Sequence, residues 1–147
     1  MNIMPYKPVY RDQCLAIFNS NRPKYFDISE LPTFINWLEH YADENYFVLE
    51  QDGDIIGCGG IFYESDKNTG GLSWGMVHAQ EQGKGYGKMF TQHRIGLFRT
   101  LYPGASLQLN TSQHTVTFYE KMGFRVISVK PDGYSIGLDR YDMVAEG

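Results

Sequence analysis

The chain has 147 residues and a formal net charge of −4, and 42% of its residues are apolar, which suits one domain spanning 1–147 and argues against non-specific binding to nucleic acid. No apolar run approaches the ~20 residues needed to cross a bilayer, and the N-terminus lacks a signal-peptide core, so we expect no membrane partner. Cys14 and Cys58 form neither a Cys-x-x-Cys pair nor a zinc-type cluster, so we expect free thiols in a cytoplasmic protein without a metal site.

The first part of the chain predicts a strand, two helices and a hairpin. The expected elements are a strand at 2–6, helices at 9–19 and 29–41, and strands at 46–50 and 54–63. A loop over 21–27 separates the helices, and Ser29 is the expected N-cap of the second, which has Pro32 in its first turn. Asp52-Gly53 is a strong turn signal between the two strands.

The middle of the chain predicts a strand followed by a long helix. The polar, glycine-rich stretch 66–71 indicates a turn, the apolar run 72–77 a strand, and 85–101 a helix. The apolar stripe expected on this helix consists of Tyr86, Phe90, Leu97 and Leu101. His93 falls on the same stripe, so we interpret it as a half-buried histidine with a partner rather than as a catalytic one.

The segment Gln82–Gly87 joins this strand to the helix and contains Gly83, Gly85 and Gly87. Glycine adopts backbone angles that a β-carbon forbids and lets the chain approach a ligand closely. The first turn of a helix also offers amide groups without intrahelical partners and the positive end of the dipole. Together these features predict a diphosphate cradle. A P-loop is excluded because Met89, not Ser or Thr, follows the second lysine, and the glycine spacing does not fit a dinucleotide fingerprint.

The last part of the chain predicts a short helix among strands. The expected elements are strands at 106–110, 125–130 and 139–144 and a helix at 113–122. Ser112 or Thr111 is the expected N-cap of this helix and Gly123 its left-handed C-cap. Pro131-Asp132-Gly133 indicates a turn. The resulting order, β-α-α-β-β-β-α-β-α-β-β, predicts an α/β protein (α+β) with a mixed sheet.

Two ordered motifs resemble those of the GNAT superfamily of N-acetyltransferases. Gln82, Gly85 and Gly87 match the fixed positions of its Arg/Gln-x-x-Gly-x-Gly/Ala signature, and Tyr119–Phe124 is similar to its second motif, Tyr-Glu-Lys-x-Gly-Phe. A long helix and a strand separate the two motifs, which also suits the family. The resemblance implies a single GNAT domain over 1–147, whose central sheet splays at mid-length and admits the cofactor.

The resemblance further implies that acetyl-coenzyme A is the cosubstrate. Strand 72–77 would pair with the pantetheine amides, and the amides of the glycine loop would hold the pyrophosphate. The cofactor-binding residues that it implies are Gly75, Met76, Val77, Gln82, Gly83, Lys84, Gly85, Tyr86, Gly87, Lys88 and Ser112. Many relatives carry Asn where this chain has Ser112, and a hydroxyl can cap the helix instead, so a cofactor contact by Ser112 stays open.

Tyr119 matches the position of the family's general acid, which implies that it assists the departing thiolate. A phenol has a pKa of about 10 and a thiol about 8.5, so full proton transfer to a free thiolate is uphill by roughly 2 kcal/mol. We therefore interpret Tyr119 as a hydrogen-bond donor to the charge that develops on sulfur. The alternative is a core tyrosine packed under its helix.

The acceptor and the base are the least defined parts of the site. In the family the helix–loop–helix near the N-terminus lies over the acceptor end, so Tyr25 and Phe26 are candidate substrate contacts, or else they close the open edge of the domain. Glu64 is a candidate substrate contact and proton acceptor, and Asp66 and His78 are further candidate acceptors. Each of these three also suits a surface or structural role.

The predicted function is acetyl transfer from acetyl-coenzyme A to a primary amine of a small molecule or peptide by direct attack. One alternative is a non-catalytic domain that binds acyl-coenzyme A for sensing. Another is a phosphate- or nucleotide-binding module, which would bind ATP or NAD at least as well. The identity of the acceptor and the existence of a homodimer stay open.

Overall fold

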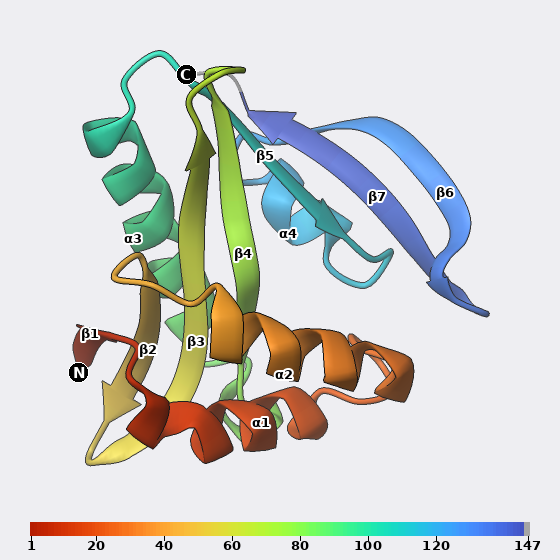
Figure 1. Cartoon of the computed structure of the whole chain (residues 1–147). Coiled ribbons are helices and arrows are strands. Elements are labelled where there is room, and N and C mark those ends of the chain that lie inside the picture. The colour runs from red at the N-terminus through yellow and green to blue at the C-terminus, as the bar shows by residue number, and fades with distance from the viewer. Residues whose placement is uncertain (146–147) are drawn as a thin grey trace.

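A computed structural model describes residues 1–145, so the last two residues of the expected domain lie outside the described range. The strands are β1 (Asn2–Pro5), β2 (Tyr46–Gln51), β3 (Asp54–Glu64), β4 (Thr69–Val77), β5 (Ser106–Thr111), β6 (Arg125–Ser135) and β7 (Leu138–Ala145). The α-helices are α1 (Arg11–Ser20), α2 (Leu31–His40), α3 (Tyr86–Leu101) and α4 (Val116–Glu120). Short 3-10 turns at Pro8–Tyr10, Ile28–Glu30 and Ala79–Glu81 precede α1, α2 and the glycine loop. The expected element order is therefore confirmed (Figure 1).

The strands form one mixed sheet in the order β1-β2-β3-β4-β5-β7-β6. All neighbouring pairs are antiparallel except β4 and β5, which run parallel. Their pairing covers only Thr69–Gly71 against Ser106–Gln108, after which the two strands diverge (Figure 1). The splayed sheet that the resemblance implied is thus present.

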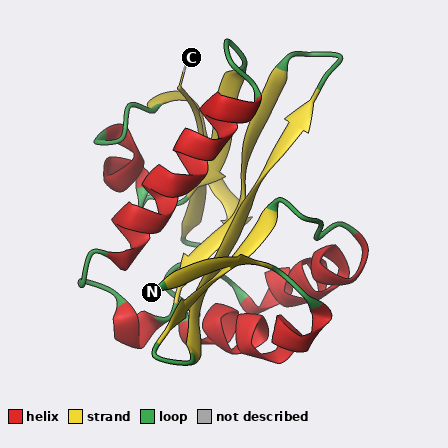
Figure 2. Cartoon of the chain, turned by 90° about the vertical axis from the view of Figure 1, so that its left-hand side faces the viewer, coloured by secondary structure: helices red, strands yellow, loops and turns green. Residues whose placement is uncertain are grey.

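Helices cover both faces of the sheet, with α1 and α2 on one side and α3 and α4 on the other (Figure 2). Under α1 and α2, the core includes Cys14, Phe18 and Phe34, all fully buried. Under α3 it includes Phe98 and Leu107. Burying each of the Phe and Leu side chains contributes about 1.5–3 kcal/mol. Within residues 1–145, no helix is long and apolar enough to cross a membrane.

β4 and β6 extend beyond their predicted bounds by three or more residues. β4 starts at Thr69 because Gly70 and Gly71 belong to the strand and not to a turn. A β-carbon at Gly70 would lie 2.8 Å from Phe98 Cζ, and one at Gly71 would lie 2.6 Å from Phe62 Cε1. These glycines therefore serve close packing of the sheet.

The turn expected at Pro131-Asp132-Gly133 is wrong, because β6 passes through these residues to Ser135. The register shifts between Lys130 and Ser135, so residues 131–134 form a bulge in the strand. Asp132 stabilises it: its amide donates to Asp139 Oδ1 (2.8 Å) and its Oδ1 accepts from the Gly137 amide (2.7 Å). The chain reverses at residues 136–137 instead.

Two expected helix caps are also wrong. Asp27, not Ser29, caps the start of the second helical segment, in a capping box where Asp27 Oδ2 accepts from the Ser29 amide and Glu30 Oε2 from the Asp27 amide, both at 2.9 Å. Neither Ser112 nor Thr111 caps α4, which begins at Val116 and carries no side-chain cap. Gly123 has the predicted left-handed conformation, with φ of 100°.

The apolar stripe predicted for α3 is only partly correct. The buried residues of this helix are Phe90, Thr91, Arg94 and Phe98, whereas Leu101 is exposed. His93 is exposed too, with its ring nearly perpendicular to that of Phe47, so the interpretation as a half-buried histidine is wrong. The buried face is centred on Arg94. Because arginine is charged, a search for apolar periodicity does not identify it as a buried position.

Candidate active site

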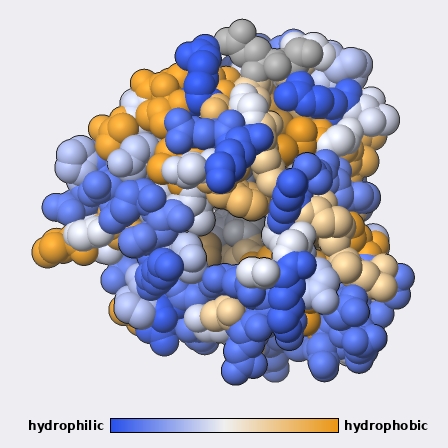
Figure 3. Space-filling view, turned by 180° about the vertical axis from the view of Figure 1, so that it is seen from behind, coloured by the Kyte–Doolittle hydropathy of each residue, from blue (hydrophilic) through white to orange (hydrophobic). Residues whose placement is uncertain are grey.

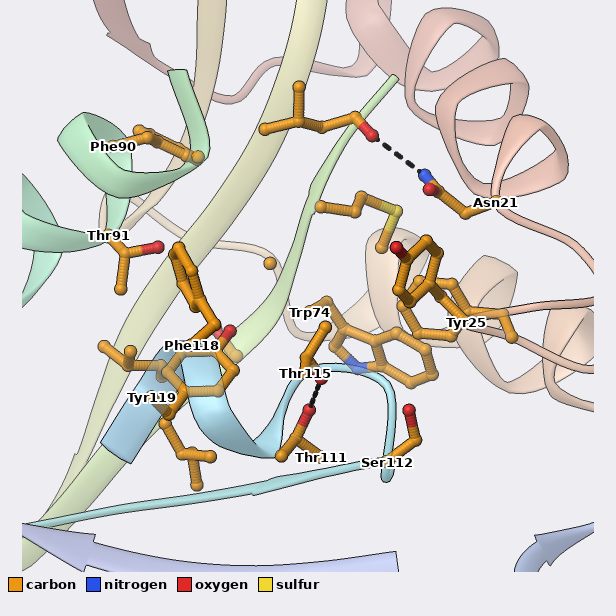
Figure 4. A pocket seen from close by; sticks show the side chains of 18 of the residues that line it. Asn21, Tyr25, Trp74, Phe90, Thr91, Thr111, Ser112, Thr115, Phe118 and Tyr119 are labelled. Atoms are coloured by element: carbon orange, nitrogen blue, oxygen red, sulfur yellow. Dashed lines mark hydrogen bonds between the residues drawn. The ribbon is translucent and has the colours of Figure 1, made fainter. Parts of the chain in front are cut away.

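A cavity of about 1140 Å³ opens where β4 and β5 separate. Its walls come from the segment between α1 and α2, from β4, the start of α3, the end of β5 and α4. Figure 4 shows Asn21 and Tyr25 on one side, Phe118 and Tyr119 on the other, and Trp74 between them. Seen from behind, on the face of α3 and α4, the molecular surface is hollowed near its centre (Figure 3).

The glycine loop lies at one end of this cavity. Gly83 and Gly85 have φ of 80° and 87°, and a β-carbon at either would meet nothing within 4 Å. The first hydrogen bond into α3 runs from the Met89 amide to Gly85 O at 3.1 Å. In the described part of the chain, the amides of residues 83–88 donate to no backbone acceptor. The loop therefore presents unpaired N–H groups to open space, as a bound phosphate requires.

Gln82 and Asn21 fix the loop to the end of β4. Gln82 Nε2 donates to Asn21 Oδ1 (2.6 Å) and to Val77 O (3.1 Å), and Asn21 Nδ2 donates to Val77 O (3.0 Å). Asn21 is buried and bonds Ile17 O as well, which anchors the network to α1. The fixed Gln of the signature thus positions the loop through its side chain. Sequence reasoning missed Asn21, because nothing local distinguishes a buried Asn after a helix.

Two predicted cofactor residues do not line the cavity. Lys84 pairs with Glu81 Oε2 at 2.9 Å, and this hydrogen bond raises the pKa of the exposed lysine. Tyr86 packs against the cluster of Leu49, Ile56 and Phe90. The cavity is lined by the other predicted cofactor residues: Gly75, Met76, Val77, Gln82, Gly83, Gly85, Gly87, Lys88 and Ser112.

β4 contains a bulge where it borders the cavity. Cys58 pairs with Met76 but Gly60 pairs with Ser73, so the ladder with β3 is interrupted around Trp74, whose φ is 38°. The opposite edge of β4 has no strand beside it beyond Gly71. Residues 72–77 thus offer one open backbone edge along the cavity, and Ser73 Oγ is buried there without a hydrogen-bond partner among residues 1–145.

Arg94 fills the space behind the bulge. Its side chain is 2% exposed, and its guanidinium donates to Gly60 O (3.0 Å) and Ser73 O (3.1 Å), two carbonyls at the interruption. A β-carbon at Gly59 would lie 2.8 Å from Arg94 Cζ, and one at Gly75 would lie 2.9 Å from Nη2. Burial lowers the pKa of Arg94 and the nearby tyrosine Tyr119 opposes that shift. Glycine in β3 and β4 therefore makes room for a buried cation.

Tyr119 reaches the cavity from α4. Burial raises the pKa of its phenol, and the charge of Arg94 acts in the opposite direction. In the described range its hydroxyl has no hydrogen-bond partner, while its ring meets the edges of Phe118 and Phe124 at centroid distances of 5.1 and 5.9 Å. The phenol is thus neutral at physiological pH and free to donate a hydrogen bond into the cavity.

Ser112 is buried at the end of β5, where its Oγ accepts from the His114 amide at 3.3 Å. Its backbone carbonyl accepts from the Thr115 and Val116 amides, at 3.1 and 3.2 Å. The hydroxyls of Thr111 and Thr115 bond to each other beside it (Figure 4). Ser112 therefore shapes the loop before α4 and also faces the cavity.

Tyr25 and Phe26 both line the cavity. Tyr25 meets His114 edge to face at 6.0 Å, and Phe26 stacks between Phe18 (4.8 Å) and Trp74 (6.3 Å). The loop between α1 and α2 is therefore held against both halves of the splayed sheet.

The three candidate proton acceptors lie outside the cavity. Glu64 is at the far end of β3 and pairs with Lys67 at 3.6 Å, and Asp66 is in the following turn. His78 Nδ1 accepts from the Gln80 amide at 3.2 Å and caps a 3-10 turn. Among the lining residues the only carboxylate is Glu30, which sequence reasoning missed because it looks like an ordinary helix-start acid.

Comparisons with known proteins agree with this geometry. The sequence profile described as "Acetyltransferase (GNAT) domain" matches residues 42–126. No protein with a curated description matches the chain significantly.

Solved structures of acetyltransferases share the fold over nearly the whole chain. A ribosomal-protein-alanine N-acetyltransferase from Brucella melitensis is 17% identical, with a TM-score of 0.78 and 100% of both chains covered. The ribosomal-protein-S18-alanine N-acetyltransferase from Escherichia coli is 18% identical, with a TM-score of 0.79 over 99% of this chain and 92% of that one. An aminoglycoside 6'-N-acetyltransferase complexed with coenzyme A is 14% identical, with a TM-score of 0.75 over 99% and 97%.

Proposed function

Because the chain belongs to the GNAT family of acetyltransferases, we propose that it transfers the acetyl group of acetyl-coenzyme A to a primary amine of a small molecule or a peptide by direct attack. The observation that carries the proposal is the continuous path from the open edge of β4 to the unpaired amides of the glycine loop. The path borders a cavity that also contains Tyr119.

The residues present fit the cosubstrate. The amides of residues 83–88 and the dipole of α3 suit the pyrophosphate, with Lys88 adding positive charge at the same end. The open edge of β4 suits a chain of amides such as pantetheine, which would bind as an added strand.

The reaction needs a neutral amine nitrogen and a stabilised leaving group. The nitrogen lone pair attacks the thioester carbonyl carbon, a C–N bond forms, the C–S bond breaks, and the nitrogen loses a proton to solvent water. The thiolate leaves with the electron pair of the C–S bond, and the Tyr119 hydroxyl donates a hydrogen bond to the developing charge. Burial raises the pKa of Tyr119, which favours partial donation over complete proton transfer.

The test has a binding stage and a turnover stage. A ligand at 100 times its Kd adds about 2.7 kcal/mol to stability, so millimolar acetyl-coenzyme A raises Tm and ATP does not. Thiol release from acetyl-coenzyme A is then measured across a broad panel of amines. Stabilisation without turnover on any amine would favour the sensing domain, and stabilisation by ATP instead would favour a nucleotide-binding module.

A further inference from the structure

The α1–α2 side of the cavity is lined mainly by aromatic rings. They are Tyr25, Phe26, Trp37, Trp74 and Tyr134. Phe26 stacks on Trp74 with the ring centroids 6.3 Å apart, and Phe34 packs against Trp74 with a centroid distance of 5.0 Å. The faces of such rings carry negative charge density and attract cations. This end of the cavity therefore suits an apolar chain that carries a positive charge.

Glu30 is the one carboxylate among the side chains that line the cavity. Its Oε2 accepts from the Asp27 amide at 2.9 Å, so the helix start fixes its position. Over residues 1–145, its Oε1 has no hydrogen-bond partner and neither oxygen belongs to an ion pair. The side chain is half-buried, and burial raises its pKa. A cationic partner would therefore stabilise the charged carboxylate, and the described residues do not supply one.

The neighbouring polar groups do not neutralise this carboxylate. The Tyr134 hydroxyl donates to Asn110 Oδ1 and is therefore already engaged. Arg94 is committed to the carbonyls of Gly60 and Ser73, and Lys88 lies in the first turn of α3 beside the glycine loop. The nearby Lys24 does not line the cavity, and its Nζ lies over the Tyr25 ring, 5.1 Å from the ring centroid. An acceptor carrying a carboxylate would therefore find no free lysine or arginine among the lining residues on this side.

We propose that Glu30 binds a second, positively charged group of the acceptor, so that the enzyme prefers diamines to monoamines and to amino acids. The reactive nitrogen must be neutral to attack, whereas the second ammonium stays charged and donates to Glu30 Oε1 between the aromatic rings. This inference rests on the proposed acetyl transfer and names the acceptor class for the same cavity.

The test compares three acceptors of matched length: a four-carbon diamine, the corresponding monoamine and the corresponding ω-amino acid. The native enzyme shows the highest kcat/KM for the diamine and the lowest for the amino acid. Glu30→Gln lowers kcat/KM for the diamine by about 10- to 100-fold, the range that a hydrogen bond to a charged group supplies. It changes kcat/KM for the monoamine by less than about threefold, because the amide can still accept from the Asp27 backbone.

Asp27→Asn is the matched control, because Asp27 belongs to the same capping box but does not line the cavity. It lowers Tm without changing the order of the three acceptors. Glu30→Asp keeps the charge on a shorter side chain and retains part of the diamine preference. Equal values for the three acceptors in the native enzyme, or equal losses for diamine and monoamine in Glu30→Gln, would overturn the proposal.

A binding measurement separates this inference from the proposed function. The diamine raises Tm of the native protein loaded with coenzyme A and has no such effect on Glu30→Gln. If the diamine raises Tm but no amine is acetylated, the cation site is supported and the proposed reaction is not. Turnover with other amines, but no shift with the diamine, would overturn the cation site and leave the reaction intact.

Discussion

At the scale of single residues, Arg94 joins the two walls of the β3–β4 bulge. Its guanidinium donates to Gly60 O and Ser73 O, next to the interruption of the β3–β4 ladder. Two sites in the strands, Gly59 and Gly75, leave room for it. A buried cation that donates to backbone carbonyls is costly to place and costlier to remove, since the carbonyls then lose their donors.

Arg94→Met should therefore destabilise the protein by roughly 2–4 kcal/mol, because two buried carbonyls lose their hydrogen bonds. For a chain of this size, each kcal/mol lowers Tm by about 2–4 °C. Thermal unfolding measures the change. The matched control is Arg99→Met, on the exposed face of the same helix, which should shift Tm by little. Equal shifts for the two variants would show that Arg94 does not hold the bulge.

Tyr119 is the residue on which the proposed chemistry depends most. Its hydroxyl has no partner within residues 1–145, and its ring packs among Phe118 and Phe124. Tyr119→Phe keeps the ring and removes only the donor, so kcat and kcat/KM should fall together while the Kd for the cosubstrate changes little. General-acid assistance is commonly worth 10²–10⁴-fold, and a thiolate leaves readily, so we expect about 100-fold.

Steady-state kinetics and a melting curve on this variant distinguish catalysis from packing. A packing role alone predicts a lower Tm with near-normal turnover at low temperature. A variant with full activity would remove Tyr119 from the mechanism.

At the scale of secondary-structure elements, the unit of β4, glycine loop and α3 provides both binding surfaces proposed for the cosubstrate. β4 contributes an open backbone edge and α3 contributes the free amides of its first turn. Gln82 and Asn21 fix the angle between them by sharing Val77 O. The contacts proposed for the pyrophosphate are backbone amides, which leaves Lys84 free to pair with Glu81.

Gly87→Glu tests this unit, because it places a carboxylate in the first turn of α3 where the pyrophosphate is proposed to bind. A β-carbon there meets only Val77 Cγ2, at 3.8 Å, so the fold tolerates it. Apposing like charges costs several kcal/mol, and we expect the Kd for coenzyme A to rise by about 100-fold or more. Equilibrium binding gives the Kd. Gly85 is a poorer target, because its φ of 87° strains any side chain.

Gly96→Glu is the matched control for this variant. Gly96 lies in the same helix with open space around it, roughly 13 Å from Gly87 at 1.5 Å of rise per residue. Both substitutions replace glycine in a helix and should leave Tm unchanged or slightly raised. An unaltered Kd in a folded Gly87→Glu protein would show that the glycine loop does not hold the cosubstrate.

At the scale of the whole molecule, the cavity exists because the sheet is joined at its centre by only a short parallel pairing. Thr69–Gly71 and Ser106–Gln108 connect β4 to β5, and the strands separate beyond it. The Tyr25–His114 contact links the loop before α2 to the loop before α4. A ligand in the cavity would thus contact both halves of the sheet, and we expect it to stabilise the molecule as a whole.

Much of the fold could be predicted from the sequence because its signals are local. The order of strands and helices followed from hydrophobic periodicity, and the left-handed Gly123 from its place after a helix. The errors arose where a distant neighbour overrides a local signal. Pro131-Asp132-Gly133 has the composition of a turn, but the Asp132 amide bonds to Asp139 across the hairpin. Gly70 has the composition of a loop, but Phe98 packs closely against it within the sheet.

The sequence by itself determined the glycine loop, the Tyr119 motif and the family, because each of these features lies in a short run of adjacent residues. Only the tertiary structure decided what surrounds them. Asn21 meets Gln82 across 61 positions of sequence, and Arg94 meets Gly60 across 34. Glu30 faces the cavity only because α2 docks across the sheet. Such partners are fixed by packing between elements, and no local pattern of polar residues specifies which buried group they will meet.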